Sequence, residues 1–162
     1  MNYKKPYEKM FLYKIKKFFS LMWRKIYIYE CKRNGMKVGK NLRIMSGVDF
    51  GSEPWLIEIG DNVVISKDVM FSTHDGGANV IRNLGIKNIN TFGKIQIGNN
   101  VFIGARSILL PNVKIGDNVI IGANSIVNKD IPPNSVVAGV PIRKIMSLDD
   151  YKKKLFVNGK VK

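Results

Sequence analysis

The sequence predicts an all-β chain: a parallel β-helix of about four coils, with an amphipathic helix before it and a short helix after it. One observation is an aliphatic residue at every sixth position through most of the chain from Val38 onward. Another is a run before residue 36 in which apolar and lysine residues separate at helical spacing. We therefore divide the chain into a basic helical arm (1–36), a β-helix domain (37–146) and a closing helix with its tail (147–162).

The six-residue period is clearest in residues 97–132, which read IGNNVF, IGARSI, LLPNVK, IGDNVI, IGANSI and VNKDIP. Such a period predicts one short strand and one turn per block, and three blocks close a triangular coil of about 18 residues. Coils that stack in parallel align identical positions into aliphatic ladders. The coils predicted are 38–55, 59–76, 97–114 and 115–132, with Gly and Asn at corners that need a positive φ.

Two segments interrupt this period. The stretch SEPWLIEI (52–59) shifts the phase by three residues. Residues 77–96 form a segment too long for a corner, and a long loop on a rigid scaffold is usually functional. We expect 77–96 to be an excursion that helps to cover an acceptor pocket.

The two ends are expected to be helical. In residues 7–32 one face collects the apolar side chains Phe11, Ile15, Phe18, Phe19, Met22, Trp23, Ile26 and Tyr29, and lysines lie opposite. This face fits either a membrane-surface helix or a cap over the open end of the β-helix, and the sequence leaves both readings open. At the other end, Ser147 to Asp150 has the form of a capping box.

The net charge of +15 lies mostly in the arm: residues 1–40 carry a net +10 and the other 122 residues only +5. This distribution argues against a nucleic-acid-binding domain. Lysines interrupt every apolar stretch of the arm, which indicates neither a signal peptide nor a bilayer-spanning segment. With Cys31 as the only cysteine, a cytoplasmic protein is expected, peripheral at the inner face of the membrane if the arm binds lipid.

Residues 38–146 resemble the hexapeptide-repeat acyltransferase family. The segment IGANSIVNKDIPPNSVVAGVPIRKI (121–145) is similar to the end of its sugar O-acetyltransferase branch. The segments 51–63 and 72–77 (GSEPWLIEIGDNV and STHDGG) look closest to the capsular-polysaccharide group. The resemblance implies a left-handed coil, a homotrimer with active sites between subunits, and acetyl-CoA as co-substrate without a metal.

Acetyl transfer to a hydroxyl needs a group that removes the hydroxyl proton, and a histidine suits this step. His74 is the only histidine, and it precedes the excursion, where the family has its catalytic histidine. We predict direct attack on the thioester, because Cys31 lies outside the repeats and the chain has no nucleophile elbow. An acceptor should orient the imidazole. The candidates are Asp49, Glu53 and Asp75, and the sequence does not choose between them.

The resemblance also implies residues for acetyl-CoA. Ala105 and Ala123 match small residues of the groove for the pantetheine arm, and Asn128 and Lys129 match positions beside the arm and the phosphates. Arg143 matches a position near the nucleotide. Asn128 stands where Thr is common, and Met146 stands where relatives often carry a second Arg, which suggests a weaker phosphate grip.

Two further residues are candidates for the acceptor site, each with an equally plausible alternative. Trp55 could stack on a sugar ring or fill a subunit interface. Arg82 could contact an acidic sugar or a phosphate, or be a surface charge.

The function predicted is an O-acetyltransferase that acts on a sugar or polysaccharide precursor. The alternatives are an N-acetyltransferase for an amine, and a non-catalytic module that binds membrane or nucleic acid through the arm. A β-helix carbonic anhydrase is excluded because it needs three histidines around zinc and the chain has one.

Overall fold

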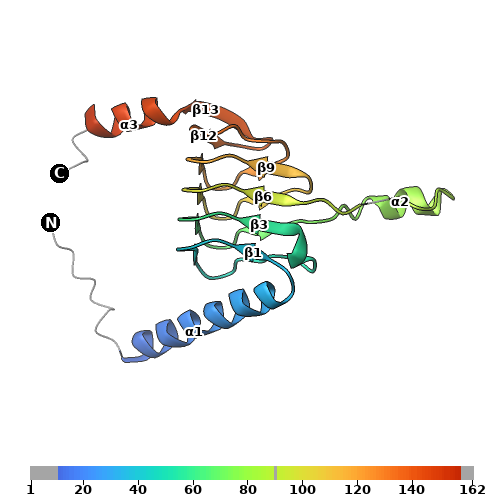
Figure 1. Cartoon of the computed structure of the whole chain (residues 1–162), viewed down its shortest axis with the longest axis horizontal. Helices are drawn as coiled ribbons and strands as arrows, with labels where there is room; N and C mark the ends of the chain where they lie inside the picture. Colours follow the sequence, from blue (N-terminus) through green and yellow to red (C-terminus); the bar gives the residue numbers. More distant parts are fainter. Residues whose placement is uncertain (1–10, 90, 158–162) are drawn as a thin grey trace.

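The computed structural model describes residues 11–89 and 91–157 and forms a column of stacked parallel strands with a helix at each end (Figure 1). Helix α1 (Phe11–Arg33) crosses the first coil, and α3 (Leu148–Val157) follows the last strand. The parallel strands and both terminal helices confirm the prediction of a parallel β architecture with a helix before it and a helix after it. Residues 7–10 of the predicted helix lie outside the described residues, as does the tail from residue 158.

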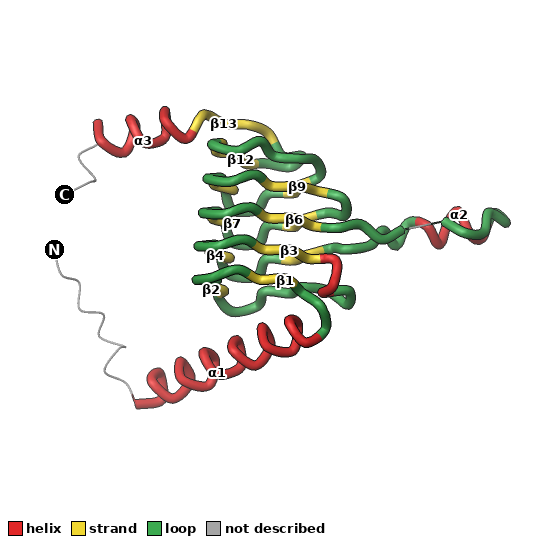
Figure 2. The backbone as a smooth tube through the Cα atoms, viewed as in Figure 1, coloured by secondary structure: helices red, strands yellow, loops and turns green. Residues whose placement is uncertain are grey.

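Three sheets form the faces of the column (Figure 2). Sheet A contains β1 (Lys37–Val38), β3 (Ile57–Ile59), β6 (Ile95–Ile97) and β9 (Val113–Ile115). Sheet B contains β2 (Arg43–Ile44), β4 (Val64–Ile65), β7 (Phe102–Ile103), β10 (Ile120–Ile121), β12 (Ser135–Ala138) and β13 (Arg143–Ser147). Sheet C contains β5 (Met70–Phe71), β8 (Ile108–Leu109) and β11 (Ile126–Val127). Among the strands of the described residues, every pair is parallel except β12 with β13, an antiparallel closure that the repeat did not predict.

The core consists of aliphatic ladders that run up the column. In sheet B, Ile65, Ile103 and Ile121 align in successive strands, and each is completely buried. Burial of a branched aliphatic side chain stabilises the fold by about 1.5–3 kcal/mol. The six-residue period in the sequence is therefore the period of inward-facing positions.

Asn supplies positive φ at the corners as expected, and so do Gly47 and Gly51 (φ of 73° and 68°), but the glycine that follows each aliphatic residue has a different role. Asn62, Asn100 and Asn118 have φ of 55° to 58°. Side-chain amides also bond between coils along this corner: Asn41 Nδ2 donates to Asn62 Oδ1 at 2.9 Å, and Asn100 Nδ2 donates to Asn118 Oδ1 at 2.8 Å. Gly104, by contrast, is not among the residues with positive φ. A Cβ there would lie 2.4 Å from the Ala123 backbone nitrogen. The glycine after each aliphatic residue thus allows the next coil to approach.

The register explains both interruptions. In sheet B, Arg43 pairs with Val64, 21 positions later, while Phe102 and Ile120 are 18 apart. The three extra residues form a 3-10 helix, η2 (Pro54–Leu56). In sheet A, Ile59 pairs with Ile97, so about twenty further residues leave the column between them. They form an arm that carries α2 (Ala78–Asn83) and projects from the column (Figure 1); residues 95 and 96 of the predicted excursion already belong to β6.

The two terminal helices differ in how well their contacts match the prediction. On α3, Ser147 Oγ accepts a hydrogen bond from the Asp150 backbone nitrogen at 3.1 Å, which is the N-cap bond of the predicted capping box. The Asp150 carboxylate accepts a 2.6 Å hydrogen bond from the same hydroxyl and another from the Ser147 backbone. On α1, Tyr27, Ile28 and Cys31 pack on the core, whereas the predicted aromatic face is exposed. The idea that this aromatic face covers the β-helix is therefore wrong. No helix within the described residues is both long and apolar enough to cross a membrane.

Candidate active site

His74 lies in the neck through which the chain leaves the column. It follows β5 and forms an isolated antiparallel bridge with Phe92 on the returning strand of the arm. Two backbone hydrogen bonds close the neck on either side: Asp75 N donates to Thr91 O at 2.9 Å, and Gly93 N donates to Thr73 O at 2.8 Å. Backbone pairing thus fixes the main chain at His74, while the side chain is 47% exposed.

Glu53 is the partner of the His74 ring. His74 Nδ1 lies 2.9 Å from Glu53 Oε2. The same oxygen accepts a 2.5 Å hydrogen bond from Thr73 Oγ1, and the other carboxylate oxygen accepts one of 2.6 Å from Ser52 Oγ. Only 9% of Glu53 is exposed, so its carboxylate is nearly enclosed by these donors. Of the three carboxylates proposed as the orienting acceptor, the structure selects this one.

The hydrogen bonds also fix the ionisation state of this carboxylate. Burial raises the pKa of Glu53, but the hydrogen bonds from Ser52, Thr73 and His74 outweigh burial and hold that pKa at about 2. An ionised carboxylate only accepts hydrogen bonds, so the proton of a neutral imidazole belongs on Nδ1. The second nitrogen, Nε2, is then free to accept a proton from a substrate.

Beside His74 the neck and the column enclose a groove of about 820 Å³. This groove is lined by Ser72, His74, Asp75, Gly76, Gly77, Ala78, Ile81, Ile89, Thr91, Leu110, Pro111, Asn112 and Asn128. It therefore joins the candidate base to Asn128, a residue predicted to contact acetyl-CoA. The α2 arm forms one wall, in agreement with the expectation that the excursion covers a pocket.

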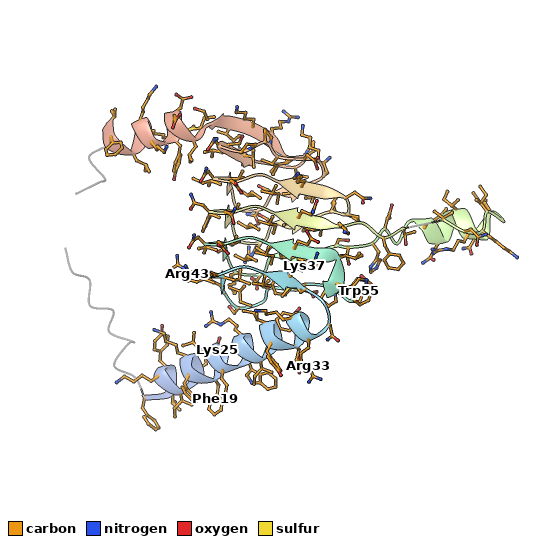
Figure 3. All side chains as sticks on the ribbon, viewed as in Figure 1. Phe19, Lys25, Arg33, Lys37, Arg43 and Trp55 are labelled. Carbon is orange, nitrogen blue, oxygen red and sulfur yellow. The ribbon has the colours of Figure 1, made fainter. Side chains whose placement is uncertain are left out.

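The other acceptor candidates have different surroundings. Asp75 lines the groove, but its Oδ1 accepts a hydrogen bond from Gly77 N at 2.8 Å, as in a turn. Asp49 accepts from Gly51 N at 2.9 Å outside the groove. Arg82 bonds within the arm, to Asn79 Oδ1 at 2.9 Å and Ile89 O at 3.5 Å, and Trp55 is exposed on η2 beside Gly35 (Figure 3). Of these four residues, only Asp75 lies in the groove within this chain.

The residues predicted for acetyl-CoA lie in three places: two corners beside sheet C, and strand β13. Ala105 and Ala123 lie one above the other before the strands of sheet C, and Asn124 N donates to Ala105 O at 2.8 Å. Asn128 and Lys129 follow the last strand of sheet C, at the edge where His74 lies. Arg143 is exposed on β13, where it pairs with Ala138. Sheet C therefore separates the two alanines from the candidate base.

Ser52, Thr73 and Phe92 contact the Glu53–His74 pair and were not predicted from the sequence. The break in the six-residue period could have indicated two of them. With a first coil of 21 residues instead of 18, Glu53 aligns with His74 of the next coil, and Ser52 aligns with Thr73. Phe92 packs its ring edge-on to the imidazole at 6.0 Å between centroids. No repeat signal covers this residue, because it lies in the excursion.

Similarity to known proteins agrees with this architecture. Residues 94–129 match the family described as bacterial transferase hexapeptide (six repeats). Protein CapG of Staphylococcus aureus is 49% identical over 146 residues, which cover 88% of this chain and 84% of CapG. Galactoside O-acetyltransferase of Escherichia coli (strain K12) is 37% identical over 81% of this chain, but over only 63% of its own length. A solved galactoside acetyltransferase in complex with coenzyme A superposes with a TM-score of 0.56 at 38% identity, covering 74% of this chain and 58% of that one.

The chain belongs to the bacterial hexapeptide-repeat transferases, which confirms the predicted resemblance. Of the two relatives compared by sequence, CapG is the more similar. In the part of the chain that the structure describes, no three His, Cys, Asp or Glu side chains gather as a metal site.

Proposed function

We propose that the protein is an acetyl-CoA-dependent O-acetyltransferase that acts on a hydroxyl of a sugar or polysaccharide precursor. The observation that carries this proposal is the Glu53–His74 pair at the edge of an 820 Å³ groove on a hexapeptide-repeat scaffold. The relatives named as galactoside O-acetyltransferase and as galactoside acetyltransferase bound to coenzyme A support both the acceptor class and the co-substrate.

The arrangement of the pair supports the following reaction. His74 Nε2 accepts the proton of the acceptor hydroxyl as its oxygen attacks the thioester carbonyl carbon. The carbon–sulfur bond then breaks, and the imidazolium returns the proton to the departing CoA thiolate. Glu53 stabilises the imidazolium, because its carboxylate is ionised above a pH of about 2 and lies 2.9 Å from Nδ1. No covalent acyl-enzyme is needed.

A complete acetyl-CoA site requires a second copy of the chain under this proposal. The small groove residues Ala105 and Ala123 lie at the opposite edge of sheet C from His74. A neighbouring copy of the chain could place its own Ala105 and Ala123 against the His74 edge of this chain. The two edges would then form one acetyl-CoA site. We propose a homotrimer with three such sites, in which Asn128, Lys129 and Arg143 contact the CoA arm and its phosphates.

The proposal includes the handedness of the coil, the number of coils and the domain boundaries. Similarity to solved hexapeptide-repeat enzymes supports a left-handed coil, and the sequence repeat supports four coils. We propose that the β-helix domain spans residues 37–146, between the basic arm (1–36) and the closing helix with its tail (147–162). A cytoplasmic location is proposed because the co-substrate is an intracellular acyl donor.

The proposal is tested by incubating the protein with labelled acetyl-CoA and sugars that offer either free hydroxyls or a free amine. We expect CoA release to depend on the hydroxyl acceptor, and the product to be an ester that mild base cleaves. A base-stable amide would favour the N-acetyltransferase. The absence of acetyl-CoA binding would favour the non-catalytic module.

A further inference from the structure

Helix α1 contacts the column through one narrow face only. Tyr27 Oη accepts a hydrogen bond from Phe50 N at 2.9 Å, and the two rings stack with centroids 5.6 Å apart. Arg24 Nη1 donates to Ile44 O at 2.9 Å, and Cys31 is buried. These positions recur at helical spacing and close the first coil of the β-helix. They account for the attachment of the helix but not for its remaining apolar side chains.

The opposite face of α1 is aromatic, and its side chains are outside the hydrophobic core that the described residues form. At 100° per residue its direction is roughly opposite to that of Arg24, Tyr27 and Cys31. Its large side chains are strongly exposed: Phe11 74%, Phe18 64%, Phe19 50%, Trp23 66% and Tyr29 62%. Figure 3 shows Phe19 on the side of the helix that faces away from the strands. A contiguous apolar surface of this kind normally marks an interaction site.

The charges around this face indicate what covers it. Lys14, Lys25 and Lys32 project at one edge of the aromatic face, and Lys16 projects at the other. Residues 11–33 carry seven basic side chains against Glu30 alone, a net +6. Two such helices would repel each other face to face, whereas anionic lipid headgroups would attract both lysine edges. Aromatic rings between lysines also match the polarity of a bilayer interface.

We propose that α1 is an interfacial membrane helix, which lays its aromatic face into the headgroup region of an anionic bilayer. The β-helix then lies on the watery side of α1, because the capping residues are on the opposite face. The column extends away from the bilayer with α3 at its far end (Figure 1). This inference does not depend on acetyl transfer, since it rests on α1 alone.

Trp23 provides a direct reporter of this contact. The chain has two tryptophans, so in full-length protein carrying Trp55→Phe the fluorescence comes from Trp23. We expect vesicles of phosphatidylglycerol and phosphatidylcholine at low salt to shift the Trp23 emission to the blue and to reduce acrylamide quenching. Vesicles of phosphatidylcholine alone should give little change, and added salt should release the protein. If anionic vesicles neither shift the Trp23 emission nor reduce its quenching by acrylamide, the proposal is overturned.

Matched variants separate the aromatic and the basic contributions. The double change Phe18→Ser and Phe19→Ser should weaken vesicle partitioning at least about tenfold, because each substitution removes apolar surface that the bilayer would bury. Phe156→Ser, a 69% exposed residue on α3, should have no effect. Lys14→Gln, Lys25→Gln and Lys32→Gln together should reduce anionic-vesicle binding and its salt dependence. The triple change Lys152→Gln, Lys153→Gln and Lys154→Gln, on α3, should not.

The same variants test the competing occupant, a second copy of the chain. We expect the Phe18→Ser and Phe19→Ser protein to keep the native oligomeric mass by light scattering without vesicles. A smaller mass would show that the aromatic face joins copies, and would overturn membrane docking. Equal loss of vesicle binding in the α1 and α3 lysine variants would also overturn it, because any basic surface would then suffice.

Discussion

Replacing Glu53 with Gln would test how the carboxylate supports His74. In the transition state the imidazole carries a positive charge, and its 2.9 Å contact with Glu53 becomes a charge-assisted hydrogen bond. Such a bond contributes about 1.5–3 kcal/mol. Because the His74 side chain is 47% exposed, solvent screening favours the lower part of this range. At about 1.4 kcal/mol per tenfold, the turnover number of Glu53→Gln should fall roughly 10- to 100-fold, closer to tenfold.

The assay is acetyl-CoA consumption at saturating acceptor, with melting temperature measured on the same samples. Glu58→Gln is the matched control, since Glu58 bonds Lys37 at 2.9 Å and Gln96 at 3.0 Å on sheet A and does not contact His74. This control should retain turnover near that of the native protein. A folded Glu53→Gln protein within about twofold of native turnover would refute the role of the carboxylate.

Three further outcomes are expected. The difference in melting temperature between the native protein and Glu53→Gln should shrink as pH falls from about 4.5 toward 2: the pKa of Glu53 is lowered, so its stabilisation is complete above the ordinary value of 4.5 and disappears as the pH passes the folded value of about 2. Gly104→Ala should lower the melting temperature by several degrees, since overpacking costs about 1–3 kcal/mol and the new Cβ would meet Ala123 backbone at 2.4 Å; Gly76→Ala, with no atom within 4 Å, should not. Light scattering should give about three times the 18.3 kDa chain mass, with activity lost on dilution to monomers, and a fully active monomer would contradict shared sites.

The fold was predictable because the repeat records burial directly. Each inward position, such as Ile103 or Ile121, must be aliphatic to fill the column, so the period of the coils appears in the sequence. The glycine after such a residue was assigned the wrong cause, because the approach of the next coil is a three-dimensional property. The antiparallel strand β13 was not predicted, because the six-residue repeat ends before it.

The candidate site was predicted in part. His74 could be named because it is the only histidine and because it precedes the excursion, where the family has its catalytic histidine. The choice of Glu53 depended on the length of one coil: with 18 residues the position below His74 is Leu56, and with 21 it is Glu53. The three-residue 3-10 helix that changes this length could be seen as a phase break, but its effect on the register needed the structure.

The amphipathic pattern of α1 predicted the helix but not its orientation. The most apolar face is exposed, and the column is capped by Arg24, Tyr27 and Cys31, which combine hydrogen bonds with packing. A helical wheel ranks faces by hydropathy alone, so it could not find a cap that depends on polar contacts.

The measurement that tests the central claim most directly is the turnover of His74→Ala beside its affinity for acetyl-CoA. If His74 removes the acceptor proton in the transition state, turnover should fall about a hundredfold or more while acetyl-CoA affinity stays nearly unchanged. A His74→Ala protein with near-native turnover would contradict the mechanism, and so would one that loses activity only through weaker acetyl-CoA binding.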